Sequence, residues 1–398
     1  MFRKMPFILL AIIVCVSWLS PWIPPSTQSV LYGISLSIKS FIVFVLPFVV
    51  FGLLFKTAVN FAGKASKMIL WLLAVICCSN FLSTLMSYSV GTLAYRFDLS
   101  LNFPNEGIAL LPAFEFSFPS WIGNSQAMFS GLALGVILGI LKPVWSKAIS
   151  LKLEKVINIL LRGVLVAIPF FIVGFVIKMQ HDQLLTYIFR NYSLIFFLVA
   201  SATYTYIAFI YFIVNGFQGR AAINSLKNML PAAIAGFGSM SSAAAMPLTI
   251  LGAEKNAKNP DLARSIIPAT VNIHLMGDCF AIPIFAFAVL KSFGVSEPSL
   301  FSYLIFASYF VLAKFSVAAV PGGGILVMLP ILETYLGFNV EMLSLITALY
   351  ILFDPVITCA NILGNGGFTM GMENLAKALP AGGAFDQKAM RAELENAL

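Results

Sequence analysis

Two stretches decide the fold: residues 231–253, PAAIAGFGSMSSAAAMPLTILGA, and residues 318–327, AAVPGGGILV. Both lie within apolar sequence, and both are broken by glycine, serine or proline. The pieces on either side of the first break are only about 8 to 12 residues long, whereas a helix needs about 20 residues to cross a bilayer. Broken backbone at membrane depth is tolerated where protein buries it. We therefore predict two re-entrant helical hairpins, at residues 231–253 and 300–338.

The composition requires a membrane as the solvent. Of the 398 residues, 60% are hydrophobic and only 10% are charged, whereas a soluble domain carries about 25% charged residues. The apolar runs are continuous and do not alternate every second residue, which favours helices over a barrel. Lysine and arginine in short cytoplasmic loops explain the net charge of +8. We predict an all-α polytopic membrane protein that contacts lipid and a small-molecule substrate, and no nucleic acid.

Eight apolar segments are candidates for transmembrane helices. They are residues 6–23, 30–55, 68–94, 125–141, 159–179, 192–217, 265–290 and 343–363. Arg3 and Lys4 place the N-terminus in the cytoplasm. The basic loops after the second, fourth and sixth spans then lie on the same side, and the acidic loop after the third lies outside. This agreement supports the count and places both termini in the cytoplasm.

The final third of the chain reads as hairpin, span, hairpin, span, and the two hairpins enter from opposite sides. Paired broken segments in corresponding positions mark the binding site of many secondary transporters. Backbone amides at the N-terminus of a half-helix attract a carboxylate. We therefore expect substrate at the two hairpin tips. The residues expected to bind it there are Ser241, Ser242, Val320, Pro321, Gly322 and Gly323.

Four ionisable residues lie at the predicted membrane depth, where a charge is costly and usually functional. They are His274, Asp278, Lys314 and Asp354. His274 and Asp278 are four residues apart, so a continuous helix would place them on one face, either as a proton-binding pair or as a structural hydrogen bond. Lys314 lies seven residues before Pro321. It either fills the place of a bound cation or pairs structurally with Asp278 or Asp354.

A stripe of polar residues runs along the eighth span and just beyond its end. Asp354, Thr358, Asn361 and Asn365 are spaced four, three and four residues apart, which places them along one side of a helix. Such a stripe either joins helices or lines a site. The acid, together with a glycine-rich run at residues 364–367 that we expect to be irregular, favours a site. We predict that Asp354, Thr358 and Asn361 bind substrate.

This ordered set of motifs resembles the dicarboxylate/amino acid:cation symporter family, the sodium:dicarboxylate symporters that include glutamate transporters. The resemblance implies a homotrimer of elevator-type transporters with inverted repeats, in the cell inner membrane, and no enzyme activity. Scaffold helices 1–2 and 4–5 would occupy residues 1–67 and 120–190. Helix 3 of the transport domain would occupy residues 68–97, the transport core residues 191–372, and a cytoplasmic tail residues 373–398.

The resemblance also points to the coupling ions. Asn272-Ile273-His274-Leu275-Met276 stands where the family has Asn-Met-Asp-Gly-Thr, and Asn365 matches a sodium-binding aspartate. Because hard cations favour carboxylate oxygens, these departures put two sodium sites in doubt and make proton coupling through His274 an alternative. We expect sodium or a proton as the coupling ion, and no other cofactor. The residues expected to take part are Asn272, His274, Asp278, Lys314, Asn361 and Asn365, with Asn272 and Asn361 as metal ligands.

The substrate class follows from the same resemblance. Glutamate-type members hold a side-chain carboxylate with an arginine, which matches Ile357 here, and a bidentate arginine is hard to replace. Amino-acid carriers hold the amine with an aspartate, which matches Asp354. A neutral amino acid is therefore favoured, with a C4-dicarboxylate or an acidic amino acid as the alternative. A passive channel remains a further alternative, as does an intramembrane hydrolase built on Ser242, His274 and Asp278.

Overall fold

The computed structural model describes residues 11–12, 15–16, 18–62, 67–96, 110–119, 121–122, 124–182, 184–317 and 323–378, and all regular structure within them is helical. The predicted all-α class is confirmed. The helices, in chain order, are η2 (Ser20–Trp22), α2 (Pro25–Ala62), α3 (Lys67–Arg96), α4 (Asn124–Leu141), α5 (Pro143–His181), α6 (Leu184–Val214), α7 (Gly219–Ser239), α8 (Ser242–Asn256), α9 (Pro260–Thr270), α10 (Met276–Ser292), α11 (Leu300–Lys314), α12 (Gly323–Leu336) and α13 (Val340–Ala378). Much of the first predicted span and the tail after residue 378 lie outside the described residues.

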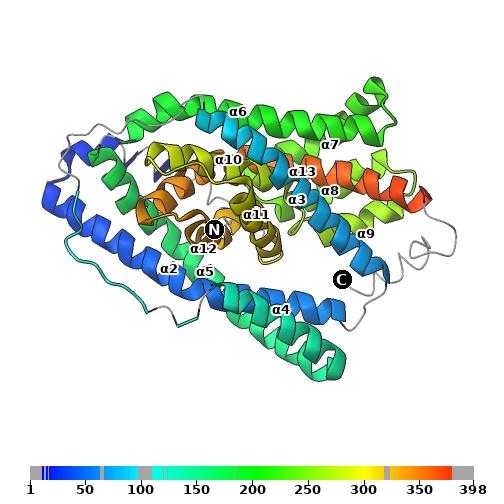
Figure 1. Cartoon of the computed structure of the whole chain (residues 1–398), viewed down its shortest axis with the longest axis horizontal. Helices are drawn as coiled ribbons and strands as arrows, with labels where there is room; N and C mark the ends of the chain where they lie inside the picture. The colour runs from blue at the N-terminus through cyan, green and yellow to red at the C-terminus, as the bar shows by residue number, and fades with distance from the viewer. Residues whose placement is uncertain are drawn as a thin grey trace.

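The helices pack in two groups. Helices α2, α4 and α5 pack on one another, whereas α3 and α6 to α13 form the second group. In Figure 1, α2 follows the lower edge of the molecule, α6 follows the upper edge, and α10 and α13 lie between them. A Cβ atom at Gly131 or Gly135 of α4 would collide with the backbone of α2. The contact between α2 and α4 therefore depends on these glycines.

Helix α10 is the central helix of the second group. It contacts α3, α6, α12 and α13, and each of its residues except Lys291 is buried. A helix that is apolar around its whole circumference is a core helix. Because Asp278 lies in the first turn of α10, the fold carries this carboxylate into the interior of the protein.

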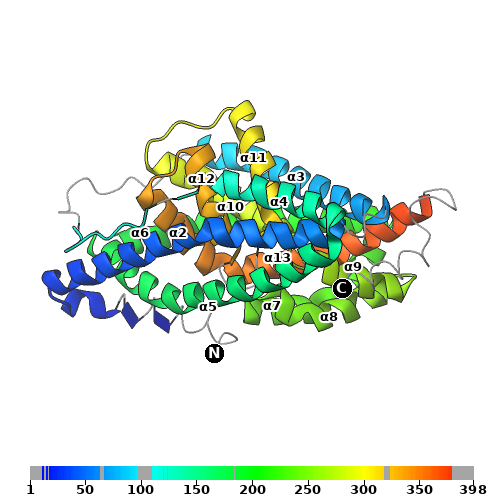
Figure 2. The same cartoon turned by 90° about the horizontal axis from the view of Figure 1, so that it is seen from below.

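Each predicted hairpin corresponds to a pair of helices in contact, α7 with α8 and α11 with α12, and their re-entrant placement in a membrane stays a prediction. The two pairs lie in opposite halves of the molecule (Figure 2). The first arm of the first hairpin is longer than predicted: α7 begins at Gly219, spans 21 residues and passes through Pro231. A proline removes one helical hydrogen bond, but α7 continues because it packs along α8 and α13. The second tip, with Val320, Pro321 and Gly322, lies outside the described residues.

Two predictions near the seventh and eighth spans were wrong in detail. The span at residues 265–290 is two helices, α9 and α10, separated by a non-helical segment at residues 271–275. The glycine-rich run at residues 364–367 is not irregular but lies inside the continuous helix α13. A Cβ at Gly364 would lie 3.1 Å from Met276 Cβ, and one at Gly367 would lie 3.1 Å from a methyl group of Ile210. These glycines therefore allow neighbouring helices to approach α13.

By length and composition, three helices in the described part of the chain could cross a membrane. They lie at Trp71–Arg96 in α3, Ser193–Val214 in α6 and Glu341–Ala376 in α13. The fifth predicted span lies within α5, which begins at Pro143, so the preceding basic stretch belongs to the same helix. The eight-span count stays a prediction.

Candidate functional site

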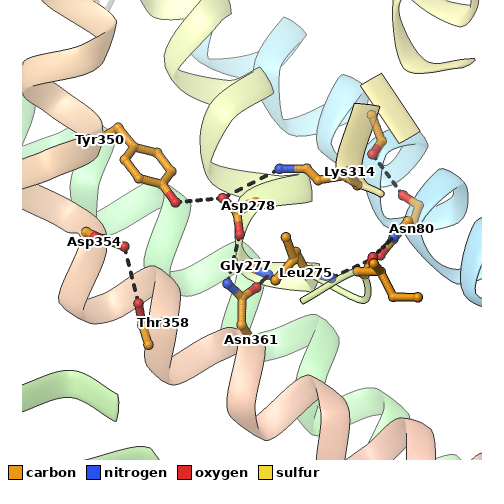
Figure 3. A network of polar contacts seen from close by, with 11 residues as sticks. Asn80, Leu275, Gly277, Asp278, Lys314, Tyr350, Asp354, Thr358 and Asn361 are labelled. Atoms are coloured by element: carbon orange, nitrogen blue, oxygen red, sulfur yellow. Dashed lines mark hydrogen bonds and ion pairs between the residues drawn. The ribbon is translucent and has the colours of Figure 1, made fainter. Parts of the chain in front are cut away.

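The carboxylate of Asp278 is the centre of a buried polar cluster (Figure 3). The Tyr350 hydroxyl of α13 donates to Oδ1 at 2.7 Å, and Asn361 Nδ2 of the same helix donates to Oδ2 at 2.8 Å. The Lys314 ammonium of α11 lies 3.5 Å from Oδ1. Both oxygens are therefore engaged, by three side chains from two helices.

Lys314 is the last residue of α11, and its side chain is completely buried. Its Nζ makes no hydrogen bond within the described residues, but it lies 4.5 Å from the ring centroid of Phe310, a cation–π distance. The C-terminal end of a helix also favours a cation. Of the two acids considered as its partner, the structure brings Asp278 into ion-pair distance.

The other arm of the second hairpin also reaches Asp278. Gly323 and Gly324 are buried at the start of α12. A Cβ at Gly324 would collide with Asp278 Oδ1 and with the Tyr350 hydroxyl. A helix N-terminus favours a nearby carboxylate. Both arms of the second hairpin therefore meet at this one carboxylate, the first through Lys314 and the second through Gly324.

Two asparagines hold the break between α9 and α10. Asn361 Oδ1 accepts from the backbone nitrogen of Gly277 at 2.7 Å. Asn80 of α3 donates to Ile273 O at 2.7 Å and accepts from Leu275 N at 3.3 Å. These bonds satisfy backbone groups that helix ends leave unpaired. The sequence analysis missed Asn80, although an amide inside the apolar third span was a visible signal.

His274 belongs to a second polar cluster. It lies in the break before α10, so it shares no continuous helix with Asp278, and the predicted pairing of these two residues is wrong. Its Nε2 lies 2.9 Å from Ser79 Oγ and its Nδ1 lies 3.2 Å from Asn365 Oδ1. The ring centroid is 4.3 Å from that of Phe368. The imidazole is thus buried among neutral side chains of α3 and α13.

The candidate metal ligands are separated. Asn272 is exposed in the break, whereas Asn361 is buried and uses its amide for Gly277 and Asp278. Asn365 donates to the backbone oxygens of His274 and Asn361. Within the described ranges, no three His, Cys, Asp or Glu side chains gather in a way that could hold a metal ion. Ion binding by Asn272 and Asn361 stays a prediction.

Asp354 lies on α13 between the contacts of the two hairpins. The Thr358 hydroxyl donates to its Oδ1 at 3.2 Å, and both side chains are buried. Four residues before Asp354, Tyr350 packs against the start of α12; four residues after it, Thr358 Cγ2 would lie 3.4 Å from a Cβ at Gly236 of α7. At the rise of an α-helix, Tyr350 and Thr358 are about 12 Å apart along the axis of α13. The predicted stripe therefore passes between the two hairpins.

The tip of the first hairpin is tight. Helix α7 ends at Ser239, the capping residue Met240 adopts a left-handed conformation with φ 48°, and α8 begins at Ser242. Ser241 Oγ accepts from Ala244 N at 3.3 Å and so caps α8. Ser242 is buried in the first turn. Both predicted serines therefore lie at the tip, and the Ser241 side chain stabilises the turn.

Comparison with models of known protein families gives a match over most of the chain. The model of the sodium:dicarboxylate symporter family matches residues 125–375. This range holds nearly all of α4, α5 to α12 and most of α13, and it includes His274, Asp278, Lys314 and Asp354. No curated protein matches the chain.

Proposed function

The chain belongs to the sodium:dicarboxylate symporter family, and on that premise we propose that it carries an amino acid, preferably a neutral one, together with a cation. Members of this family are transporters, so the chain is a membrane-embedded, cation-coupled symporter and not an enzyme. The substrate, the coupling ion and the mechanism of movement are the parts that we propose.

The position of Asp354 is the observation that carries the substrate proposal. Its carboxylate is buried beside Thr358, on the part of α13 that lies between the two hairpins. A buried carboxylate at a binding site attracts a cationic group, and the amine of an amino acid supplies one. Ile357, the position matched to an arginine in glutamate-type members, is buried in the apolar core. An isoleucine offers nothing to a second carboxylate, which supports a neutral substrate.

Uptake into proteoliposomes tests this proposal. We expect radiolabelled neutral amino acids to accumulate, and Asp354→Asn to lower uptake by roughly 30-fold or more, because a lost buried charge partner costs about 2–5 kcal/mol. Glu333→Gln is the matched control, because this acid is exposed on α12. Unchanged uptake in Asp354→Asn would remove the amine site. Competition by C4-dicarboxylates or acidic amino acids alone would establish the alternative substrate.

For the coupling ion we propose a proton, with His274 as its site. The imidazole faces Ser79 of α3 and Asn365 and Phe368 of α13, and histidine is the side chain that most readily changes charge near neutral pH. Imposed proton and sodium gradients separate the two possibilities in the same vesicles. Strict sodium dependence, with no response to a proton gradient, would overturn proton coupling.

For the movement we propose an elevator, in a homotrimer of the cell inner membrane with both termini in the cytoplasm. The packing of α2, α4 and α5 as one group and of α3 and α6 to α13 as another supports a scaffold and a moving domain. The mass of the detergent-solubilised protein tests the trimer. Saturable uphill uptake is expected, whereas large ohmic currents would indicate a passive channel.

A further inference from the structure

The ion pair between Lys314 and Asp278 joins the second hairpin to the central helix α10. We propose that the Lys314 ammonium is a tethered cation that occupies an ion site on Asp278, so that this site takes no sodium ion. The inference rests on the proposed function as a cation-coupled carrier, and it says which group supplies the positive charge at one of the cation sites. It does not depend on which solute is carried.

While Lys314 is paired with Asp278, the oxygens around this carboxylate leave no position for a sodium ion. Hard cations take several oxygen ligands at once. Here Asp278 Oδ2 accepts from Asn361, Asp278 Oδ1 accepts from Tyr350, and Asn361 Oδ1 accepts from the backbone of Gly277. Each oxygen is aimed at a donor of the protein. The positive charge that a carboxylate at this depth requires comes from Lys314 instead.

Lys314 lies between an opposite charge and an aromatic ring. The ammonium is completely buried and has no hydrogen-bond partner in the described part of the chain. Its ammonium lies beside the Asp278 carboxylate and over the face of the Phe310 ring. The other titratable groups that act on this cluster are Cys279 of α10, and Tyr350 and Asp354 of α13. Burying an ammonium is costly unless a carboxylate compensates it.

The position of Lys314 gives the tethered charge a mechanical consequence. It ends α11, while Gly324 in the first turn of α12 packs against the same carboxylate. Any movement of the second hairpin away from α10 therefore separates Lys314 from Asp278 and leaves the carboxylate without a counter-charge. A free cation at Asp278 would not impose this link, because it is not attached to the hairpin.

Removing the tethered cation should create a sodium site. We would measure thermal unfolding of the purified protein in detergent, in sodium chloride and in choline chloride at equal concentration. Lys314→Met should unfold about 5 °C or more below the unaltered protein in choline, since it leaves an uncompensated charge, and sodium should restore part of this loss. In the double variant Asp278→Asn with Lys314→Met, the sodium response should disappear. Lys291→Met is the matched control, because Lys291 also lies over an aromatic ring, 4.7 Å from the Tyr95 centroid.

The outcomes separate cleanly. A sodium-selective gain in Lys314→Met that is absent from the double variant supports the tethered cation. An equal response of Lys314→Met to sodium and choline, including failure to fold in both, overturns it, as does a sodium response that survives in the double variant. No solute is present in this experiment, so a wrong substrate assignment leaves the result unaffected. Conversely, uptake lost in Asp354→Asn bears on the proposed function and not on Lys314.

Discussion

The two helical hairpins are held against α13 and α10 by different forces. The first hairpin is held against α13 by neutral contacts, such as the close approach of Gly236 to Thr358 and Ile362, and a serine cap at Ser241 stabilises its tip. The second is held by charge, with Lys314 at the end of one arm and Gly324 of the other arm against Asp278. Two hairpins of similar construction therefore differ in what is needed to open them.

This difference decides which hairpin can respond to ions. Neutral contacts and caps are nearly indifferent to the ions around them, whereas a buried ion pair loses several kcal/mol when one partner is removed. We therefore expect substitutions in the second hairpin to have larger effects than matched substitutions in the first. Four substitutions test this comparison.

The largest effect should come from Asp278→Asn. The amide keeps the shape of the side chain but leaves the Lys314 ammonium buried without a counter-ion, at a cost of about 3–5 kcal/mol. Thermal unfolding in detergent measures the loss, with Glu333→Gln on the exposed face of α12 as the control. If Asp278→Asn is as stable as the unaltered protein, charge does not hold the second hairpin.

Gly324→Ala should have the next largest effect. Its methyl group would collide with Asp278 Oδ1 and the Tyr350 hydroxyl, which bond to each other and cannot both retreat. Overpacking of this kind lowers the stability of the fold by about 1–3 kcal/mol. Uptake should also fall, because the start of α12 can no longer pack against Asp278. Gly163→Ala is the control, since a Cβ at that helical glycine meets nothing within 4 Å. Equal behaviour of the two variants would contradict the contact at Gly324.

Gly236→Ala should cost less than Gly324→Ala, although its methyl group also collides. The nearest atom is Ile362 Cδ1, the flexible end of an apolar side chain, which can move to another rotamer. We expect a loss of about 1 kcal/mol, recovered in part when Ile362→Val is added to make room. A loss equal to that of Gly324→Ala would show that the first hairpin is as tightly constrained as the second.

The sequence predicted the parts of this comparison that depend on composition and spacing. The broken apolar stretches predicted both helix pairs, and the four-three-four spacing after Asp354 predicted a polar stripe along one helix, whose residues the structure places in α13 and buries. These signals are local, because neighbouring residues determine where a helix forms and where it breaks. The same spacing extends back to Tyr350, which the sequence analysis left out although it lies four residues before Asp354.

The sequence could not predict which side chains meet across helices. His274 and Asp278 were paired because a continuous helix would align them, but the break at residues 271–275 turns each toward a different partner. That break is held by Asn80, a residue nearly 200 positions away in the sequence. No spacing rule reaches that far, so the choice of Asp278 as the partner of Lys314 required the structure.

The smallest of the four effects should come from Ser241→Ala. The substitution removes the side-chain oxygen that accepts from Ala244 N, and the loss of such a cap costs about 1 kcal/mol. Ser241→Asp supplies a new cap and should restore the stability, since an acidic group is also favoured at a helix N-terminus. Thermal unfolding in sodium and in choline should give the same loss, because no buried charge is disturbed. A loss that depends on sodium would show that the first tip also takes part in ion binding, and the contrast between the two hairpins would then fail.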